Sequence, residues 1–167
     1  MELFPWYLLY CKRSEQERAE LHLTHQGVEC YYPKVIVEKI RRGKKEAKIE
    51  PLFPNYLFIH FEPEKISFTT VRSTRGVANF VRIGLEPCKV SAELIQTLKN
   101  NEATQVQLNA GFSEGDSVEI LEGPYAGVEA FYKESDGDTR AILLINLLHN
   151  QVELTADNKH IAKKYRA

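Results

Sequence analysis

The sequence contains few cysteines and no long apolar run. Only three of its 167 residues are cysteine, and Cys11, Cys30 and Cys88 form no C-x-x-C pair of the kind used in zinc or redox sites. No segment approaches the roughly 18 consecutive apolar residues that a membrane span needs. The first residues also lack a basic region followed by a long apolar stretch. We therefore expect a cytoplasmic protein with no membrane contact, whose thiols act as small buried apolar groups.

Signatures of catalysis are missing as well. The chain contains no P-loop, no G-x-S-x-G and no metal-ligand spacing. A hydrolytic or nucleotide-processing enzyme would have to use His22, His25 and His60 beside Glu20 or Glu62, but histidines without such spacing are more often surface or packing residues. The sequence therefore predicts no enzyme, no cofactor and no metal.

Charge is unevenly distributed along the chain. The whole chain holds 22 basic and 23 acidic side chains, which nearly cancel. Residues 1–100 hold 16 basic against 12 acidic side chains, whereas residues 101–167 hold 6 against 11. Only the first part is therefore expected to approach a polyanion.

The first elements are a buried strand and a helix. The apolar run WYLLYC at residues 6–11 predicts a central strand. Ser14 and Glu17 have the spacing of a capping box that opens a helix, and Gly27 is placed to end it. The apolar face of this helix would be formed by Ala19, Leu21, Leu23 and Val28. Its polar face would align Arg18, His22, His25 and Gln26, which stand three or four residues apart.

A basic segment and an aromatic strand follow. Six Lys or Arg residues surround Gly43 in residues 38–50, which predicts a basic hairpin or an exposed loop between strands at 31–37 and 52–61. Alternation along the second strand places Tyr56, Phe58 and His60 on one face, and Leu57, Ile59 and Phe61 on the other. Such a strand lies inside a core or offers one face to a partner, and the residues alone favour burial.

The rest of the first hundred residues completes one domain. Residues 66–76 combine hydroxyl groups with Arg72 and Arg75, a pattern typical of phosphate contacts, and residues 77–84 predict another strand. Ser91 is placed as the N-cap of an amphipathic helix at 90–99. This order of elements indicates an α+β sandwich, with helices packed on one sheet, over residues 1–100. Residues 101–114 are expected to be a linker to a second domain at 115–167.

The second domain has two patterns. Alternation between 118 and 154, with a turn at Asp136-Gly137-Asp138, predicts a small five-stranded β-barrel. Leu121, Tyr125, Val128 and Tyr132, and then Ala141, Leu144, Ile145 and Leu148, also have helical spacing, which predicts an αα-hairpin about the same turn. Both interpretations stay open, and a segment with two folds of similar energy would show such a double pattern.

Several segments together resemble the NusG family of transcription elongation factors. They are Trp6-Tyr7 before a basic turn and helix, FPNYLF at 53–58, VRSTRGVANFVRIG at 71–84, and GDSVEILEGPYAG with the later NLL and VEL. The resemblance covers nearly the whole chain in the right order, and WYLLYCKR, TRGV and LLINLL are similar to an operon-specific branch. It implies a non-enzymatic regulator of RNA polymerase, with an N-terminal α/β sandwich and a C-terminal KOW-type domain. In that branch the second domain is a helical hairpin in the closed protein and a five-stranded barrel after release.

The resemblance also implies binding sites. The patch for the polymerase β′ clamp helices maps onto Tyr10, Tyr56, Phe58 and Ile83. The residues that read and hold a hairpin of non-template single-stranded DNA map onto Lys12, Arg13, Arg18, His22, His25, Gln26, Thr70, Arg72, Thr74 and Arg75. The motif for the polymerase β gate loop reads Ser67-Phe68-Thr69-Thr70 here.

Between the domains, the resemblance implies an ion pair of Glu50 with Arg140. It also implies a docking face formed by Phe131, Tyr132, Leu144 and Leu148. The released barrel would contact a ribosomal small-subunit protein, which couples transcription to translation, and the protein is expected to be a monomer. The alternatives are a general elongation factor of the same family with a permanent barrel and a ribosome-associated RNA-binding KOW protein.

Overall fold

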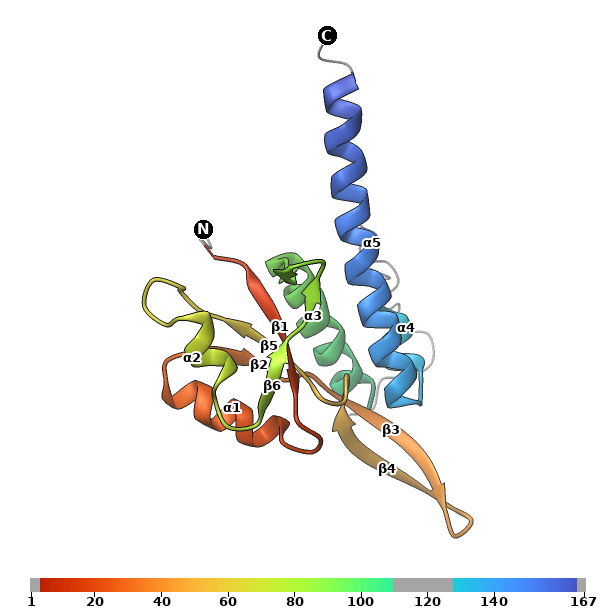
Figure 1. The fold of residues 1–167 in the computed structure, drawn as a ribbon. Helices are drawn as coiled ribbons and strands as arrows, with labels where there is room; N and C mark the ends of the chain where they lie inside the picture. Colours follow the sequence, from red (N-terminus) through yellow and green to blue (C-terminus); the bar gives the residue numbers. More distant parts are fainter. Residues whose placement is uncertain (1–3, 110–127, 165–167) are drawn as a thin grey trace.

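The computed structural model describes residues 4–109 and 128–164 (Figure 1). One antiparallel sheet forms its centre, in the order β2 (Glu29–Tyr31), β5 (Tyr56–His60), β1 (Trp6–Cys11) and β6 (Val77–Phe80), and β9 (Lys89–Val90) also pairs with β1. The strand β1 therefore has neighbours on both sides, as predicted. Its register opposite β5 pairs Leu8 with Phe58 and Tyr10 with Tyr56.

Helices cover both faces of this sheet, so the domain has three layers. On one face, α1 (Gln16–His25) and α2 (Phe68–Arg72) pack against Leu57 and Ile59. On the other face, Phe58 packs with α3 (Ala92–Asn109). The predicted alternation along 56–61 is confirmed, and the mixed α/β architecture with it.

The helix α1 begins differently from the prediction. Ser14 lies in the left-handed region with φ of 62°, and Glu15 precedes the helix without a side-chain cap, so no capping box forms. The physical reason is Gln16, whose buried amide donates to the carbonyl oxygens of Phe53 and Tyr56 and anchors the first turn to the sheet. Leu21 is 54% exposed and does not join the core, whereas Gly27 ends the helix at φ of 89° as expected.

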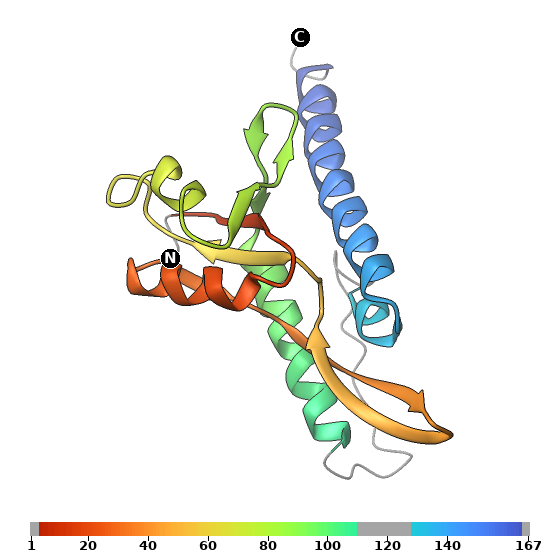
Figure 2. The same ribbon diagram turned by 60° about the horizontal axis from the view of Figure 1, so that its bottom comes forward.

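Residues 34–51 form a two-stranded ribbon of β3 (Lys34–Arg41) and β4 (Lys44–Pro51). Figure 2 shows that it projects from the body of the domain. Arg42 and Gly43 connect the strands with φ of 54° and 77°, the values of the primed turns that match the twist of a hairpin. A basic hairpin is therefore present, and the strand predicted from residue 52 begins only at Tyr56.

The helix α3 is longer than predicted. The Ser91 hydroxyl accepts a hydrogen bond from the Leu94 amide, which confirms the N-cap, but the helix continues to Asn109. Residues 101–109, expected in the linker, are thus helical, because the segment contains neither glycine nor proline and is rich in helix-forming residues. The strand predicted at 77–84 is also divided: after β6 a small hairpin of β7 (Arg82–Ile83) and β8 (Glu86–Pro87) turns at Gly84.

The C-terminal elements are helices. They are α4 (Glu129–Lys133) and α5 (Gly137–Lys164). Asp136 caps α5 by accepting hydrogen bonds from the amide and hydroxyl of Thr139. Helical spacing rather than strand alternation therefore describes residues 129–133 and 137–164 in this structure. The positions Val118, Ile120, Leu121 and Tyr125 of the two patterns lie outside the described residues. None of the helices in the described ranges is long and apolar enough to cross a membrane.

Among the glycines that the structure describes, Gly76 is the one whose replacement should cost most. Its φ is 92°, and a Cβ there would lie 2.8 Å from both the backbone nitrogen of Ala19 in α1 and the backbone oxygen of Glu15, which precedes α1. We expect Gly76→Ala to lower the free energy of unfolding by roughly 2–4 kcal/mol, because backbone strain and a clash add. Gly84→Ala is the matched control, since its φ is 65° but nothing lies within 4 Å of the added Cβ. Equal urea midpoints for the two variants would contradict this account.

Candidate functional site

Three of the four residues predicted for the clamp patch reach the surface, and the fourth does not. Tyr10 is 43% exposed, Tyr56 and Ile83 are half-buried, and Phe58 is completely buried. The rings of Tyr10 and Tyr56 lie 5.3 Å apart on neighbouring strands. We call these four residues the apolar patch. Phe58 is unavailable to a partner in this state.

The buried cluster that contains Phe58 also contains side chains of α4 and α5. Phe131 packs edge-on against Phe53 at 5.1 Å, and Phe53 packs against Phe58 at 6.1 Å. The Tyr132 hydroxyl donates to the Leu98 carbonyl oxygen at 2.7 Å. Leu144 and Leu148 are buried in the same cluster, and Tyr56 and Ile83 pack against it. The predicted docking face of the C-terminal helices thus lies over the side of the sheet that holds the apolar patch.

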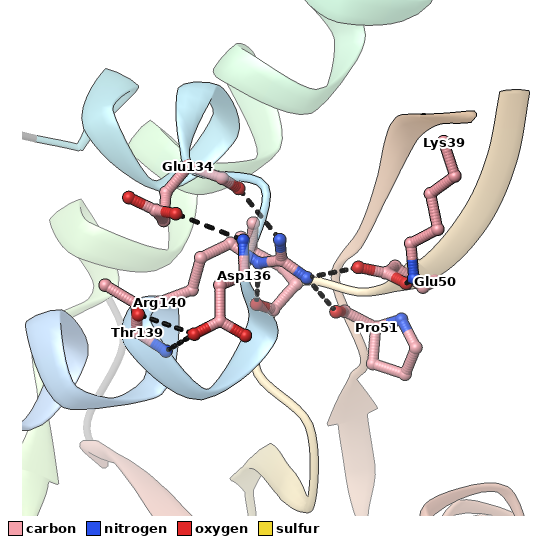
Figure 3. A network of polar contacts seen from close by, with 8 residues as sticks. Lys39, Glu50, Pro51, Glu134, Asp136, Thr139 and Arg140 are labelled. Carbon is pink, nitrogen blue, oxygen red and sulfur yellow. Dashed lines mark hydrogen bonds and ion pairs between the residues drawn. The ribbon is translucent and has the colours of Figure 1, made fainter. Parts of the chain in front are cut away.

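A buried arginine joins α5 to the end of β4 (Figure 3). The Arg140 side chain is fully buried and its Nη2 lies 2.8 Å from Oε1 of Glu50. The guanidinium also donates to three carbonyl oxygens, those of Leu52 (2.7 Å), Glu134 (2.8 Å) and Pro51 (3.2 Å). The other oxygen of Glu50, Oε2, lies 3.1 Å from Nζ of Lys39. The sequence pattern gave no sign of these three carbonyl partners or of Lys39.

The charge of Glu50 is stabilised in this setting. Burial alone would raise the pKa of Glu50, but hydrogen bonds from Arg140 and Lys39 offset that effect and hold the pKa below its ordinary value. The guanidinium is satisfied as well, since its hydrogen-bonding groups face a carboxylate and three carbonyls. A buried pair of this kind is costly to break from one side, because the remaining charge stays buried without its partner.

A second polar link lies on the same side of the sheet. The Tyr31 hydroxyl donates to Oε2 of Glu102 at 2.9 Å, and burial raises the pKa of Tyr31 well above its ordinary value. Nζ of Lys99 lies 5.3 Å and 5.6 Å from the ring centroids of Tyr31 and Trp6. Sequence reasoning missed Glu102 because its segment was expected to be a linker.

Most residues predicted to contact DNA lie at the surface around α1 and α2. Lys12, Arg13, Arg18, His25, Gln26, Thr70, Arg72 and Arg75 are exposed, and His22 is half-buried. The Lys12 amide donates to the Gly76 carbonyl oxygen at 2.8 Å, which brings the basic turn beside Arg75. Arg18 is partly engaged, with Nη1 3.1 Å from Oε1 of Glu15. We call this set the basic surface.

Thr74 differs from the rest of that set. It is only 6% exposed, its hydroxyl donates to the Thr70 carbonyl oxygen at 2.9 Å, and it accepts from Nε2 of Gln26 at 3.2 Å. A direct DNA contact is thus not available to Thr74 in this structure. Its hydroxyl instead holds the end of α1 against the loop after α2.

The segment predicted for the gate loop starts α2. Ser67 caps the helix by accepting from the Thr70 amide at 3.1 Å. Phe68 is half-buried and packs edge-on against Tyr7 and Phe61. Thr69 is exposed and lines a shallow hollow with Phe68, Arg72, Phe80, Arg82 and Glu86. Ser67, Thr69 and Thr70 are exposed, whereas Phe68 is mostly taken up by packing.

Comparison with known proteins identifies the family. The family model described as "Transcription termination factor nusG" matches residues 4–99, more than half of the chain. The chain belongs to the NusG family. It is 25% identical to the Transcription termination/antitermination protein NusG of Thermus thermophilus, over 95% of this chain and 97% of that protein. The NusG of Borreliella burgdorferi is 23% identical over the same shares of the two chains.

A further relative and a solved structure were also found. The NusG of Helicobacter pylori strain 26695 is 25% identical over 71% of this chain and 74% of that protein. A solved structure titled "Domain interaction in Thermotoga maritima NusG" is 22% identical, covers 72% of this chain and 67% of its own, and has a TM-score of 0.39. The NusG family consists of transcription factors.

One of the three histidines considered for an enzyme, His60, is a packing residue. The His60 ring stacks on Trp6 at 5.1 Å, with Nδ1 3.2 Å from Glu29 and Nε2 3.0 Å from the Phe4 carbonyl oxygen. No group of three or more metal-ligating side chains occurs within the part of the chain that the structure describes.

The Arg140 network should dominate the attachment of α4 and α5. We expect Arg140→Ala to weaken it by roughly 3–5 kcal/mol, because Glu50 loses its buried partner and three carbonyl oxygens lose their donor. Lys39→Ala is the matched control on the same carboxylate; Lys39 is half-exposed, so about 1 kcal/mol or less is expected. Amide hydrogen exchange over residues 128–150 measures the effect. Equal loss of protection in both variants would contradict it.

Proposed function

We propose that this NusG-family protein is an operon-specific antitermination factor of the RfaH type. It binds RNA polymerase and a hairpin in the exposed non-template DNA strand, and it reduces pausing and termination. The observation that carries the proposal is the buried Glu50–Arg140 pair, which ties α5 to β4 on the side of the sheet that holds the apolar patch. A protein built in this way is held closed until something displaces its C-terminal helices.

The apolar patch is the surface we assign to the β′ clamp helices. It combines exposed aromatic area at Tyr10 with Tyr56 and Ile83 at the edge of the buried cluster. Release of α4 and α5 would uncover Phe58 and Phe53 and enlarge the patch. Aromatic side chains are enriched in such interfaces, so the open state would be the binding state.

The basic surface is the region we assign to DNA. Its exposed Lys and Arg side chains surround the polar end of α1, and such groups bind phosphates and base edges. Gln26 and His25 are the candidates for reading bases, and Thr74 positions Gln26. Thr69 and Thr70, beside the hollow at α2, would contact the β gate loop.

The released C-terminal segment is proposed to refold into a five-stranded KOW-type barrel that contacts a ribosomal small-subunit protein. The support is the double pattern in the sequence, since residues 129–133 and 137–164 are helical here although 118–154 also alternates. Far-UV circular dichroism of Arg140→Ala tests the refolding. Strand signal should rise relative to the parent, and an unchanged spectrum together with a loss of helix docking would exclude it.

Recruitment to polymerase distinguishes this function from that of a general elongation factor. We expect the parent chain to bind a transcribing polymerase only when the non-template strand carries its hairpin element, because the apolar patch is covered. Arg140→Ala should bind without the element, and Lys133→Ala, an exposed charge change on α4, should behave like the parent. Binding of the parent to polymerase regardless of sequence would instead select the general factor.

DNA binding by the basic surface has a salt signature. Each phosphate contact that is lost should flatten the log–log salt dependence of hairpin-DNA affinity by about one unit. Arg75→Ala should therefore reduce both the affinity and the slope. Lys89→Ala, an exposed cation on β9 outside the basic surface, should change neither. An unchanged slope in Arg75→Ala would remove Arg75 from the DNA contacts.

A further inference from the structure

The β3–β4 ribbon contains the entire positive excess of the N-terminal domain. Residues 1–100 have 16 basic against 12 acidic side chains, and residues 34–51 alone have 7 against 3. The remaining residues of the domain are therefore balanced, with 9 of each sign. The proposed function assigns no task to the segment where the charge is concentrated.

The register of the ribbon places most of its basic side chains on one face. Residues paired directly across the strands share a face, so Lys39, Arg41, Lys44 and Lys48 lie on one side, together with Glu46, Glu50 and the buried Val35 and Val37. The opposite side carries Ile36, Ile40, Ala47 and Ile49, together with Lys34, Glu38 and Lys45. Four of the seven cations thus share one face of an element that projects from the domain (Figure 2).

The cations of the ribbon are available to a ligand. Arg41, Arg42, Lys44, Lys45 and Lys48 are exposed, and none of them forms an ion pair with a residue that the structure describes. Arg41, Arg42 and Lys44 line a shallow hollow at the tip with Glu46. Two other cations of the ribbon are engaged: Lys39 at Glu50, and Lys34, whose Nζ lies 5.2 Å from the ring centroid of Tyr32. The primed turn at Arg42-Gly43 joins the two strands that carry these side chains.

We propose that the β3–β4 ribbon is a second nucleic-acid contact, which binds the phosphates of a double helix. Two strands about 4.8 Å apart form a ribbon that the major groove, about 12 Å wide, admits. Residues 34–51 contain no Asn, Gln, Ser or Thr, so the contacts would be made mainly by cations to phosphates rather than by amides or hydroxyls to bases. This site is separate from the basic surface at α1 and α2.

The test uses the full chain and a fluorescent DNA duplex of arbitrary sequence, about three helical turns long, titrated at about 50 mM salt. The triple variant Arg41→Ala, Arg42→Ala, Lys44→Ala should bind about tenfold or more weakly, with a salt slope reduced by up to about three units. The control triple variant Lys65→Ala, Lys89→Ala, Lys133→Ala removes the same charge from other exposed positions and should change affinity by less than about twofold. Arg41→Lys with Arg42→Lys should retain binding.

Other outcomes decide against the ribbon. Equal losses in the two triple variants would mean that only net charge matters, and the site would be rejected. Loss of duplex binding in Arg75→Ala would move the contact to the basic surface. Competition by an acidic peptide as effective as unlabelled duplex would make the partner a protein. An RNA duplex has a deep and narrow major groove, so tighter binding of an RNA duplex than of the DNA duplex would contradict entry of the ribbon into the groove. A variant that no longer recognises the hairpin element but still binds the duplex would show that the ribbon site is independent of the proposed function. The two proposals can therefore fail separately.

Discussion

The closed arrangement of this protein depends on one buried guanidinium. Arg140 is completely buried, and a charge in that position is tolerated only because Glu50 and three carbonyl oxygens surround it. The apolar contacts of Phe131, Leu144 and Leu148 provide most of the attraction, but hydrophobic contact is not directional. The hydrogen bonds of Arg140 fix where α5 sits relative to β4. That directional contact is what makes the position of the C-terminal helices over the sheet specific.

The C-terminal helices α4 and α5 need to cover only one face of the central sheet. Its two faces bury separate clusters, and among the residues whose side chains the structure describes, none from α4 or α5 belongs to the cluster behind α1 and α2. Removal of the C-terminal helices would therefore leave that cluster, the basic surface on α1 and α2, and the pairing of β1 with β5 and β6 in place. Only the cluster around Phe58 would lose part of its packing. The N-terminal domain can thus expose an interface without losing its own fold.

Sequence predicted the parts of this structure that follow from local rules. The central strand, the alternation at 56–61, the Ser91 cap and the glycine at the end of α1 depend on neighbouring residues, and each was found. The capping box at Ser14 failed because the distant carbonyls of Phe53 and Tyr56 hold Gln16. The burial of Thr74 and the three carbonyls around Arg140 are likewise consequences of tertiary contact. In the C-terminal segment local rules favoured two folds, so tertiary contact had to decide.

Glu50 connects the ribbon to the closed state. Its Oε2 faces Lys39 of the basic face and its Oε1 faces Arg140. If a nucleic acid on the ribbon draws Lys39 toward phosphate, Glu50 loses the contact with an exposed cation, which contributes about 1 kcal/mol or less, and keeps the contact with the buried Arg140. Engagement of the ribbon would then leave α5 attached rather than release it. In the proposed function, opening would therefore be driven from the basic surface or the edge of the apolar patch, and the proposed contact of the ribbon with a double helix would be compatible with the closed protein.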